Sequence, residues 1–344
     1  MHFEIPQKVE IIINTLEEAG FEAYAVGGCV RDALLGRTPN DWDITTSAKP
    51  EQVKVLFRRT VDTGIAHGTV TVLLDKDGFE VTTYRVDGEY EDGRHPKEVT
   101  FTASLEEDLK RRDFTINAMA YNPQKGLVDL FEGQKDLKDK VIRCVGDPLE
   151  RFTEDALRIM RAVRFSAQLG FSLEENTRKA LSLLAPNLKH VSAERIQVEL
   201  VKLLVSPHPD YLRAAYEAGI TKEFLPEFDR CMETPQNTPH HCYSVGEHIL
   251  HSLLYVREDK VLRLTMLLHD IGKPVVRTTD KNGRDHFKMH APEGEKMAKG
   301  ILLTDHMYRH VTGIADRLYV MADGQAYPCA NDEELVRRGY LRRM

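Results

Sequence analysis

Residues 25–46, AVGGCVRDALLGRTPNDWDITT, decide the fold of the first part of the chain. The apolar residues 23–26 predict a strand that ends at the glycine pair, a short helix follows, and residues 41–46 predict a second strand. Glycines at a strand-to-helix turn let backbone N–H groups approach a phosphate. We therefore predict that Gly28 and Arg31, which lies one turn into the helix, bind a phosphate group.

Two carboxylates flank the only tryptophan of the chain. Side chains at positions i and i+2 of a strand share a face, so Asp41 and Asp43 should project together while Trp42 turns toward the core. Such a pair repels itself unless a cation lies between the carboxylates, and Mg²⁺ prefers oxygen ligands. Taken singly, a glycine turn and an acid pair are ordinary surface features. Their closeness in sequence favours a metal site for phosphoryl or nucleotidyl transfer, with Glu80 as a candidate third acid.

The motifs GGCVRDALLG and DWDITT together resemble the head-domain signature of class II tRNA nucleotidyltransferases and bacterial poly(A) polymerases, members of the DNA polymerase β-like superfamily. The resemblance implies an α+β fold, in which a nucleotidyltransferase head with a mixed sheet is followed by an all-α neck and an HD-like helical body. It places the head at residues 1–140, the neck with its nucleotide-selecting motif at 141–205, the body at 206–300 and an atypical tail at 301–344.

A second motif, EEDLKRRDFTINAMAYN at residues 106–122, resembles the nucleotide-contacting segment of the same family. This resemblance implies contacts to the sugar and phosphates of the incoming nucleotide by Arg111, Arg112, Asp113 and Asn117. Guanidinium groups bind phosphate through paired hydrogen bonds, and an Asp or Asn side chain accepts one from a ribose hydroxyl. A basic helix start with solvated arginines is the alternative.

Residues 146–171 resemble the neck motif that acts as a protein template in this family. We predict one helix over residues 151–169, on which Asp155 and Arg158 share a face because they are three positions apart. An Asp acceptor beside an Arg donor matches cytosine and adenine, which both offer an exocyclic amine and a ring-nitrogen acceptor. These two residues would therefore select CTP and ATP. The alternative is a surface salt-bridge ladder that includes a Glu154–Arg158 pair.

Further residues of the neck are assigned by the same resemblance. Arg161 and Arg164 would extend the nucleotide-binding surface. The segment SAERIQVEL, residues 192–200, resembles the motif that braces the neck helices. We expect it to be structural, with Arg195 and Glu199 as the bracing pair.

The charged stretch DGEYEDGRHPKEV, residues 87–99, resembles the flexible loop of enzymes that add the terminal adenosine. The loop is shortened in family members that add only the two cytidines, so its presence favours addition of the complete CCA. Asp87, Arg94 and Pro96 are the candidate switch residues. An ordinary exposed hairpin loop is the alternative.

The sequences HHCYSVGEHILHSL and LRLTMLLHDIGKP resemble an HD-type domain, with His248 and the adjacent His269 and Asp270 as candidate metal ligands. His286 and His290 could join them. The HD pattern also needs a later Asp ligand, which we do not find in the sequence. A helical body that holds tRNA is therefore expected rather than a working phosphohydrolase.

Residues 301–344 depart from the family pattern. We expect strand, turn, helix, strand and hairpin turn, which resembles the C-terminal end of an ABC-transporter ATPase with His306 as its switch histidine. No G-x-x-x-x-G-K-[ST] motif occurs in the chain, so an ATP-hydrolysing site of that kind is excluded. This segment would stand in place of the tail that holds tRNA.

Composition limits the remaining classes of function. The chain has 344 residues and a formal net charge of −7, which argues against unspecific coating of nucleic acid. Its five cysteines are scattered without a CxxC pair, as expected for reduced thiols in the cytoplasm. No apolar run is long enough to span a membrane, so no membrane partner is expected. The sequence does not indicate an oligomeric state.

These motifs together predict one activity. The 3′-hydroxyl of tRNA would attack the α-phosphate of CTP or ATP, so that CCA is added without a nucleic-acid template and pyrophosphate is released. Asp41 and Asp43 would be the catalytic residues and would hold Mg²⁺, and Gly28, Arg31 and Arg112 would bind the triphosphate. Three alternatives remain: a bacterial poly(A) polymerase with the same head motifs, an HD-domain phosphohydrolase with a degenerate head, and a truncated RNA-binding protein without catalysis.

Overall fold

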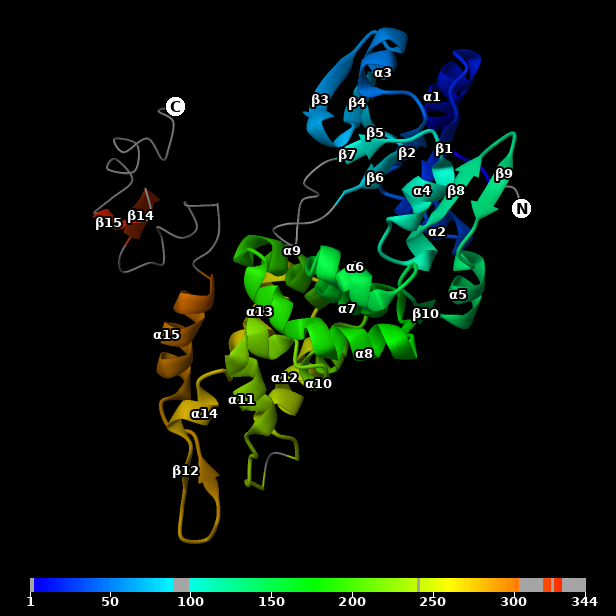
Figure 1. Ribbon diagram of the computed structural model, residues 1–344. Helices are drawn as coiled ribbons and strands as arrows, with labels where there is room; N and C mark the ends of the chain where they lie inside the picture. Colours follow the sequence, from blue (N-terminus) through cyan, green and yellow to red (C-terminus); the bar gives the residue numbers. More distant parts are fainter. Residues whose placement is uncertain (1–2, 89–98, 240–241, 303–317, 323–324, 330–344) are drawn as a thin grey trace. The chain divides into compact units, whose positions relative to one another are not determined.

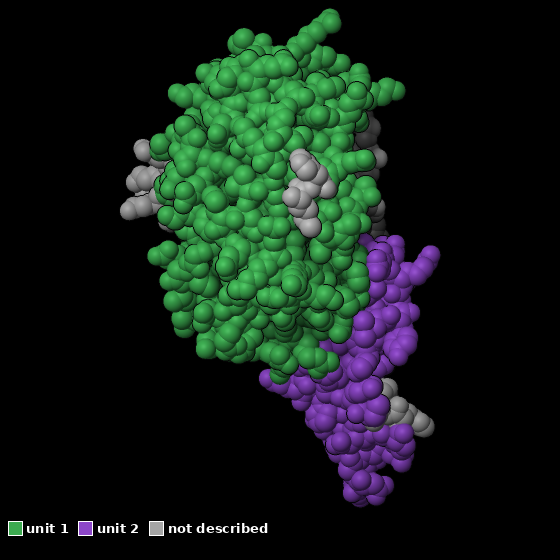
Figure 2. Space-filling model, turned by 90° about the vertical axis from the view of Figure 1, so that its right-hand side faces the viewer, with its two compact units in different colours: residues 1–224 green, residues 225–344 purple. Residues whose placement is uncertain are grey.

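The computed structural model describes residues 3–88, 99–239, 242–302, 318–322 and 325–329. The chain divides into two compact units, Met1–Phe224 and Leu225–Met344, which are coloured separately in Figure 2. The first unit holds the large sheet and the helices that follow it, and the second is mainly helical (Figure 1). Among the described residues, no helix combines the length and the apolar character needed to cross a membrane.

A seven-stranded mixed sheet forms the head, with the strand order β3-β4-β5-β2-β1-β8-β9. Its strands are β1 (Ala23–Val26), β2 (Ile44–Thr46), β3 (Thr60–Gly64), β4 (Thr69–Leu74), β5 (Asp77–Thr83), β8 (Met119–Asn122) and β9 (Gly126–Asp129). The strands β2 and β5 run parallel, and the other neighbouring pairs are antiparallel. The predicted α+β fold with a mixed sheet in the head is confirmed.

Helices pack on this sheet and complete its core. They are α1 (Gln7–Glu18), α2 (Gly28–Leu34), α3 (Pro50–Leu56), α4 (Leu105–Lys110) and α5 (Gly133–Asp139). In α1, Val9, Ile12, Ile13 and Leu16 are fully buried, at the spacing of one apolar helix face. All residues of the central strand β1 are buried as well, so the glycine turn that follows β1 is anchored on the core.

The hairpin between β4 and β5 turns two residues before its Asp-Gly dipeptide. Asp-Gly is typical of a hairpin turn, but Asp77 and Gly78 already pair with β4. The turn residues are Asp75 and Lys76, and Asp75 has a φ of 55°, a left-handed conformation that Asp adopts more readily than most residues. The position of the turn sets which residues of β5 lie opposite β4.

The neck begins with two helices, where the sequence predicted a single helix. The neck helices are α6 (Pro148–Glu154), α7 (Leu157–Leu169), α8 (Glu175–Leu184) and α9 (Ala193–Leu204), and α10 (Leu212–Glu217) follows them. Asp155 has extended backbone angles, φ −139° and ψ 103°, and its Oδ1 accepts a hydrogen bond from Leu157 N at 3.0 Å. The single helix predicted over residues 151–169 is therefore wrong, because Asp155 ends α6 and caps α7.

Two short sheets complete the first unit. The antiparallel pair is β6 (Arg85–Asp87) with β7 (Val99–Phe101), and the parallel pair is β10 (Val141–Ile142) with β11 (Ser172–Leu173). The β6–β7 pairing brings the two ends of the predicted 87–99 loop together. Residues 89–98, which include Arg94 and Pro96, lie outside the described residues.

The second unit contains α11 (Pro226–Glu233), α12 (Val245–Leu254), α13 (Lys260–Leu268), α14 (Lys273–Val276), α15 (His290–Leu302), β12 (Thr278–Thr279), β13 (Asp285–His286), β14 (Leu318–Ala322) and β15 (Gln325–Cys329). We predicted a strand at the start of the tail. This prediction is wrong for residues 301–302, because α15 continues through Leu302. The hairpin predicted near residue 323 is confirmed by the pairing of β14 with β15. Residues 303–317, with His306, lie outside the described residues.

Candidate active site

Three carboxylates lie near one another where β2 and β5 begin their parallel pairing. The register pairs Ile44 of β2 with Val81 of β5, so Asp43 and Glu80, one position earlier on each segment, lie side by side. Asp41 adds a third carboxylate two residues before Asp43. All three side chains are exposed. We name Asp41, Asp43 and Glu80 the acidic cluster.

The acid pair lies just before β2 and not within it. The strand begins at Ile44, although the Asp43 carbonyl still accepts a hydrogen bond from Val26 N at 3.0 Å. Trp42 is half-buried and does not enter the core as predicted. The reason is that β1 ends at Val26, so the residues that precede Asp43 have no partner in β1.

Electrostatics within the acidic cluster favour a bound cation. The pKa of Asp43 is raised to about 6, first by desolvation, then by repulsion from Asp41 and Glu80, while Arg112 opposes the shift. Because the Asp43 side chain remains exposed, the desolvation comes from the protein around it and not from full burial. A set of three exposed carboxylates suits a hard divalent cation.

This raised pKa leads to a prediction for metal binding. Because the carboxyl group takes up a proton as the pH falls through about 6, a divalent cation competes with that proton below pH 6. Isothermal titration with Mg²⁺ between about pH 5 and pH 7.5 should show affinity falling as the pH drops, by up to about tenfold per unit. An Asp43→Asn variant should bind weakly with little pH dependence. Equal pH dependence in the variant and the wild type would contradict the assignment.

Arg112 lies between the acidic cluster and the glycine turn. Gly27 has a φ of 83°, and a Cβ there would lie 3.0 Å from Nη1 of Arg112. Glycine is needed at this position both for the left-handed backbone and for the approach of the guanidinium group. The Nη2 atom of Arg112 lies 3.4 Å from Asp108 Oδ2, and the Nε atom is buried without a hydrogen-bond partner. Arg112 therefore keeps a donor available beside the turn.

Asp108, which the motifs did not predict as a site residue, anchors this corner. Its fully buried carboxylate accepts hydrogen bonds from Arg111 Nη2 at 2.7 Å and from Thr45 Oγ1 at 3.1 Å. Thr45 follows Asp43 by two positions, so Asp108 connects β2 to the Arg111–Arg112 pair. Burial disfavours the charge on Asp108, but the two arginines outweigh it and lower the pKa. The available signal was an acid one helical turn before two arginines.

Arg31 and Asp113 belong to a chain of hydrogen bonds that joins the head to the neck. The buried Arg31 donates to both carboxylate oxygens of Asp32 at 2.9 Å and to Asn117 Oδ1 at 2.7 Å. Asn117 Nδ2 donates to Asp113 Oδ1 at 3.2 Å, and Arg161 Nη2 lies 2.6 Å from Asp113 Oδ2. Burial opposes the charge on Asp113, but Arg161 outweighs it and the pKa is about 2. The predicted site residues of three separate motifs thus meet in one network.

The two residues predicted to read the base have other partners in this structure. Asp155 Oδ2 accepts a hydrogen bond from Arg195 Nη2 at 3.0 Å. Arg158 donates to Glu154 Oε2 at 2.7 Å and to the Arg111 carbonyl at 3.0 Å. The Glu154–Arg158 pair considered as an alternative is therefore present. Because the helix breaks at Asp155, the predicted shared helix face for Asp155 and Arg158 is wrong.

Helix α9 supports the neck from one side. Besides the contact of Arg195 with Asp155, Glu199 Oε2 lies 2.5 Å from Arg164 Nε. Burial lowers the pKa of Arg164 to about 10, and its side chain lies in the interior. The bracing role expected for residues 192–200 is confirmed by these two ion pairs.

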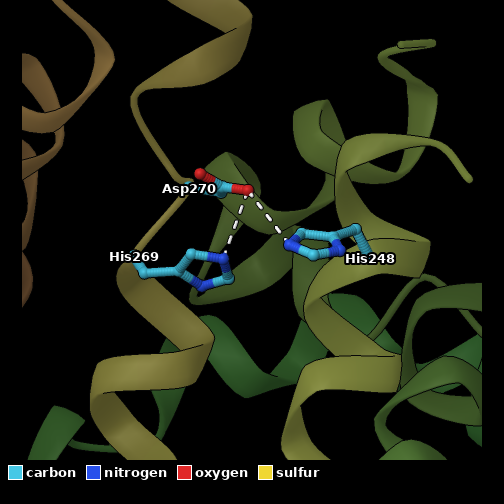
Figure 3. A group of neighbouring side chains, drawn as sticks. All are labelled: His248, His269 and Asp270. Atoms are coloured by element: carbon cyan, nitrogen blue, oxygen red, sulfur yellow. Dashed lines mark ion pairs between the residues drawn. The ribbon is translucent and has the colours of Figure 1, made fainter. Parts of the chain in front are cut away.

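A second group of candidate ligands lies in the second unit. His248 of α12 and the adjacent His269 and Asp270, which follow α13, place one ligand atom each within 4.8 Å of one another (Figure 3). In the part of the chain that the structure describes, no other group of three such residues meets this spacing. The Nε2 atoms of His269 and His248 lie 3.2 Å and 3.6 Å from Asp270 Oδ2.

A lysine already neutralises Asp270 in this group. Lys273 Nζ lies 2.7 Å from Asp270 Oδ2 and donates to Gln236 Oε1 at 2.8 Å. Burial opposes the charge on Asp270, but the bonds from His269 and Lys273 hold its pKa well below the usual range. The cluster is therefore charge-balanced by its own side chains.

The structure brings one of the two further histidines to this group. His290 Nε2 lies 3.7 Å from Asp270 Oδ1, whereas His286 pairs with Asp280 at 3.0 Å. Gly272 explains the approach of His290, because a Cβ on Gly272 would lie only 2.4 Å from the His290 carbonyl oxygen.

Family models match the chain in the order that the motifs predict. The model described as "Poly A polymerase head domain" matches residues 23–143, "Probable RNA and SrmB- binding site of polymerase A" matches residues 170–232, and "HD domain" matches residues 239–327. The HD match extends well into the segment that we predicted to resemble an ABC-transporter ATPase. That resemblance is not supported.

Individual relatives point to one family. The CCA-adding enzyme of Leuconostoc mesenteroides is 58% identical over 205 residues, which cover 59% of this chain and 51% of that protein. The solved CCA-adding enzyme of Bacillus stearothermophilus in complex with CTP is 37% identical with a TM-score of 0.59, and the match covers 74% of this chain and 71% of that one. The CCA-adding enzyme of Thermotoga maritima complexed with tRNA is 25% identical with a TM-score of 0.56, covering 79% and 72%.

The chain spans about half the length of the curated relatives it matches. Its identity to the solved Bacillus enzyme nevertheless extends over most of both chains. The three family matches, in the same order as the predicted parts, agree with that relationship. The chain belongs to the nucleotidyltransferase family that contains the CCA-adding enzymes.

Proposed function

We propose that this chain adds the sequence CCA to the 3′ end of tRNA from CTP and ATP, without a nucleic-acid template, and releases pyrophosphate. The observation that carries the proposal is the acidic cluster, which the β2–β5 register assembles close to Arg112 and the glycine turn. Similarity to CCA-adding enzymes, one of them solved with CTP and another with tRNA, supports this choice of substrates.

The nucleotidyltransferase head implies use of a divalent metal ion, and we assign Mg²⁺ to Asp41 and Asp43 with Glu80 beside them. When bound, the ion would offset negative charge at the α-phosphate and favour ionisation of the attacking hydroxyl. In the reaction the 3′-oxygen of tRNA forms a bond to the α-phosphorus and the bond to the β-phosphate oxygen breaks. Pyrophosphate leaves with the bonding electrons.

The triphosphate would be bound at the glycine turn. The Nη1 atom of Arg112 lies beside Gly27, where a guanidinium donor suits a phosphate oxygen. A Cβ on Gly28 would lie 3.7 Å from Arg31 Nη2, so the Arg31 guanidinium lies next to the glycine turn. Gly28, Arg31 and Arg112 thus form the proposed triphosphate site.

The choice of base would be made by the neck. We assign base reading to Asp155 and Arg158, whose acceptor and donor groups match the edges of cytosine and adenine. Both residues have protein partners in this structure, so the base would share or replace those bonds. Arg161 and Arg164 would extend the nucleotide-binding surface of the neck, and the Arg164 side chain is buried in the first unit.

Hydrolysis at the HD group is the second candidate activity, favoured by the ligand spacing of His248, His269 and Asp270. The ion pair between Lys273 and Asp270 argues against hydrolysis at this group, because Lys273 already neutralises the Asp270 carboxylate. We therefore expect His269→Ala to leave the kcat for C and A incorporation within about twofold of the wild type. If His269→Ala lost all activity while Asp43→Asn retained it, the HD hydrolase would be the better assignment.

The parts of the proposed enzyme follow the predicted boundaries. We assign the head to residues 1–140, the neck to 141–205 and the body to 206–300, supported by the positions of the three family matches. A cytoplasmic location is supported by three buried free thiols, at Cys29, Cys144 and Cys231.

A direct assay tests the proposal. The full chain is incubated with α-labelled CTP, Mg²⁺ and a tRNA transcript that lacks its 3′ CCA. We expect two labelled cytidines per tRNA and one released pyrophosphate for each of them. A chain that incorporates no cytidine but extends RNA with ATP alone would be a poly(A) polymerase, and the proposal would be wrong.

A further inference from the structure

One aromatic ring holds three of the arginines assigned to the nucleotide site. The Cζ atoms of Arg31, Arg161 and Arg164 lie 5.1, 5.2 and 3.8 Å from the centroid of the Phe165 ring. Arg31 comes from α2 of the head, whereas the other two lie on α7 with Phe165. The ring is buried, with 6% of its surface exposed. A segment near the start of the chain and the neck helix therefore share one aromatic contact.

Three guanidinium groups around one ring repel one another, so their placement requires compensation. Each has a carboxylate partner: Asp32 for Arg31, Asp113 for Arg161 and Glu199 for Arg164. The ring adds an attraction of its own, because the negative face of an aromatic ring binds cations within about 6 Å. That attraction is larger in a buried site, where water competes little.

The ring is also fixed by the head. Phe114 packs edge-on against Phe165, with centroids 5.8 Å apart and an interplanar angle of 80°. Phe114 directly follows Asp113, which pairs with Arg161. Phe165 therefore touches the nucleotide-contacting motif through Phe114 and the glycine-turn helix through Arg31.

We propose that Phe165 is a positioning residue of the nucleotide site, whose ring electrostatically holds Arg31 of the head and Arg161 of the neck in a fixed relation. This inference rests on the proposed function. If the triphosphate is bound by the head and the base by the neck, a nucleotide must meet both at once. Loosening the arginines then weakens nucleotide binding more than it slows the chemical step.

A fluorination series separates ring electrostatics from ring shape. Phenylalanine with one, two or three ring fluorines is introduced at position 165 of the full chain, because fluorine weakens the negative face with little change in volume. We expect the Kd of ATP, measured by equilibrium dialysis, to rise roughly twofold per fluorine, about eightfold over the series. The KM should rise in parallel while kcat changes by less than about twofold. The same series at Phe171 is the matched control, since that ring is buried, has no assigned role and has no described lysine or arginine stacked on it.

The outcomes are distinct. A steady rise in Kd at position 165 with an unchanged value at position 171 supports the assignment. Values that stay flat at position 165 in an enzyme that adds nucleotides overturn the role of Phe165 and leave the proposed function intact. If the wild type adds no nucleotide but binds ATP, the proposed function is wrong, and the slope of Kd still decides the role of Phe165. No ATP binding by the wild type would overturn both.

Discussion

An Asp43→Asn variant is expected to add nucleotides at least about a thousandfold more slowly than the wild type, a loss of roughly 4 kcal/mol of transition-state stabilisation. The reason is that the substitution removes one of the two carboxylates assigned to the metal and keeps the size of the side chain. Asp41→Asn should have a comparable effect. The measurement is single-turnover incorporation of CTP into tRNA that lacks CCA.

Folding of the variant provides a control for this prediction. The folded pKa of Asp43, about 6, lies above its ordinary value of 3.8, so the ionised side chain destabilises the metal-free fold, and this cost grows as the pH rises through that interval. Asp43→Asn should therefore melt at the same temperature as the wild type or slightly higher at pH 7. Because the side chain is exposed, screening limits the gain to below about 1 kcal/mol.

A matched variant tests whether any acid of the sheet has the same effect. Asp77 lies on β5 and pairs with Lys8 at the surface, at 2.8 Å. Asp77→Asn removes the same charge, and its exposed ion pair contributes little to stability. We expect wild-type incorporation from Asp77→Asn. A thousandfold loss in Asp77→Asn, or full activity in Asp43→Asn, would contradict the assignment of the acidic cluster.

Asp155→Asn is expected to change nucleotide choice as well as rate. The carboxylate accepts from the exocyclic amine of the base in our assignment, and the amide offers a donor on one side instead. The loss of one charged hydrogen bond should lower kcat/KM for CTP and ATP by about 10- to 100-fold. UTP should gain relative to CTP, because uracil presents the opposite pattern. The measurement is kcat/KM for each of the four nucleoside triphosphates.

The control for this variant must separate base reading from bracing. Arg195→Lys loosens the bond that holds Asp155 and keeps the acceptor for the base. It should lower kcat/KM for CTP and ATP equally and leave the rejection of UTP intact. If Asp155→Asn also left that rejection unchanged, Asp155 would be only a structural residue.

The sequence predicted the parts of the head that local pattern controls. The apolar run of β1, the glycine turn and the acid pair follow from alternation and spacing, and the structure places them together. The position of Glu80 beside Asp43 depends on the register between β2 and β5. That register pairs Ile44 with Val81, in segments that are distant in the chain, so it is not visible in local sequence.

The parts that the sequence did not predict depend on tertiary contacts. The break at Asp155 arises because its side chain caps α7 and bonds to Arg195, which lies 40 positions away in the chain. The hydrogen bond between Asp108 and Thr45 likewise joins segments that are distant in sequence, and so does the stacking of Arg31 on Phe165. A helical pattern with many arginines predicts a solvated helix surface. In the structure these arginines are buried because carboxylates and an aromatic ring contact their guanidinium groups.

The order of nucleotides added to tRNA shows whether this chain adds CCA. The full chain is incubated with a tRNA transcript that lacks CCA, all four nucleoside triphosphates and Mg²⁺, and the 3′ ends are sequenced. We predict that most extended molecules end in CCA and that addition stops there. Runs of adenosine, random addition of all four nucleotides or no extension would contradict this prediction.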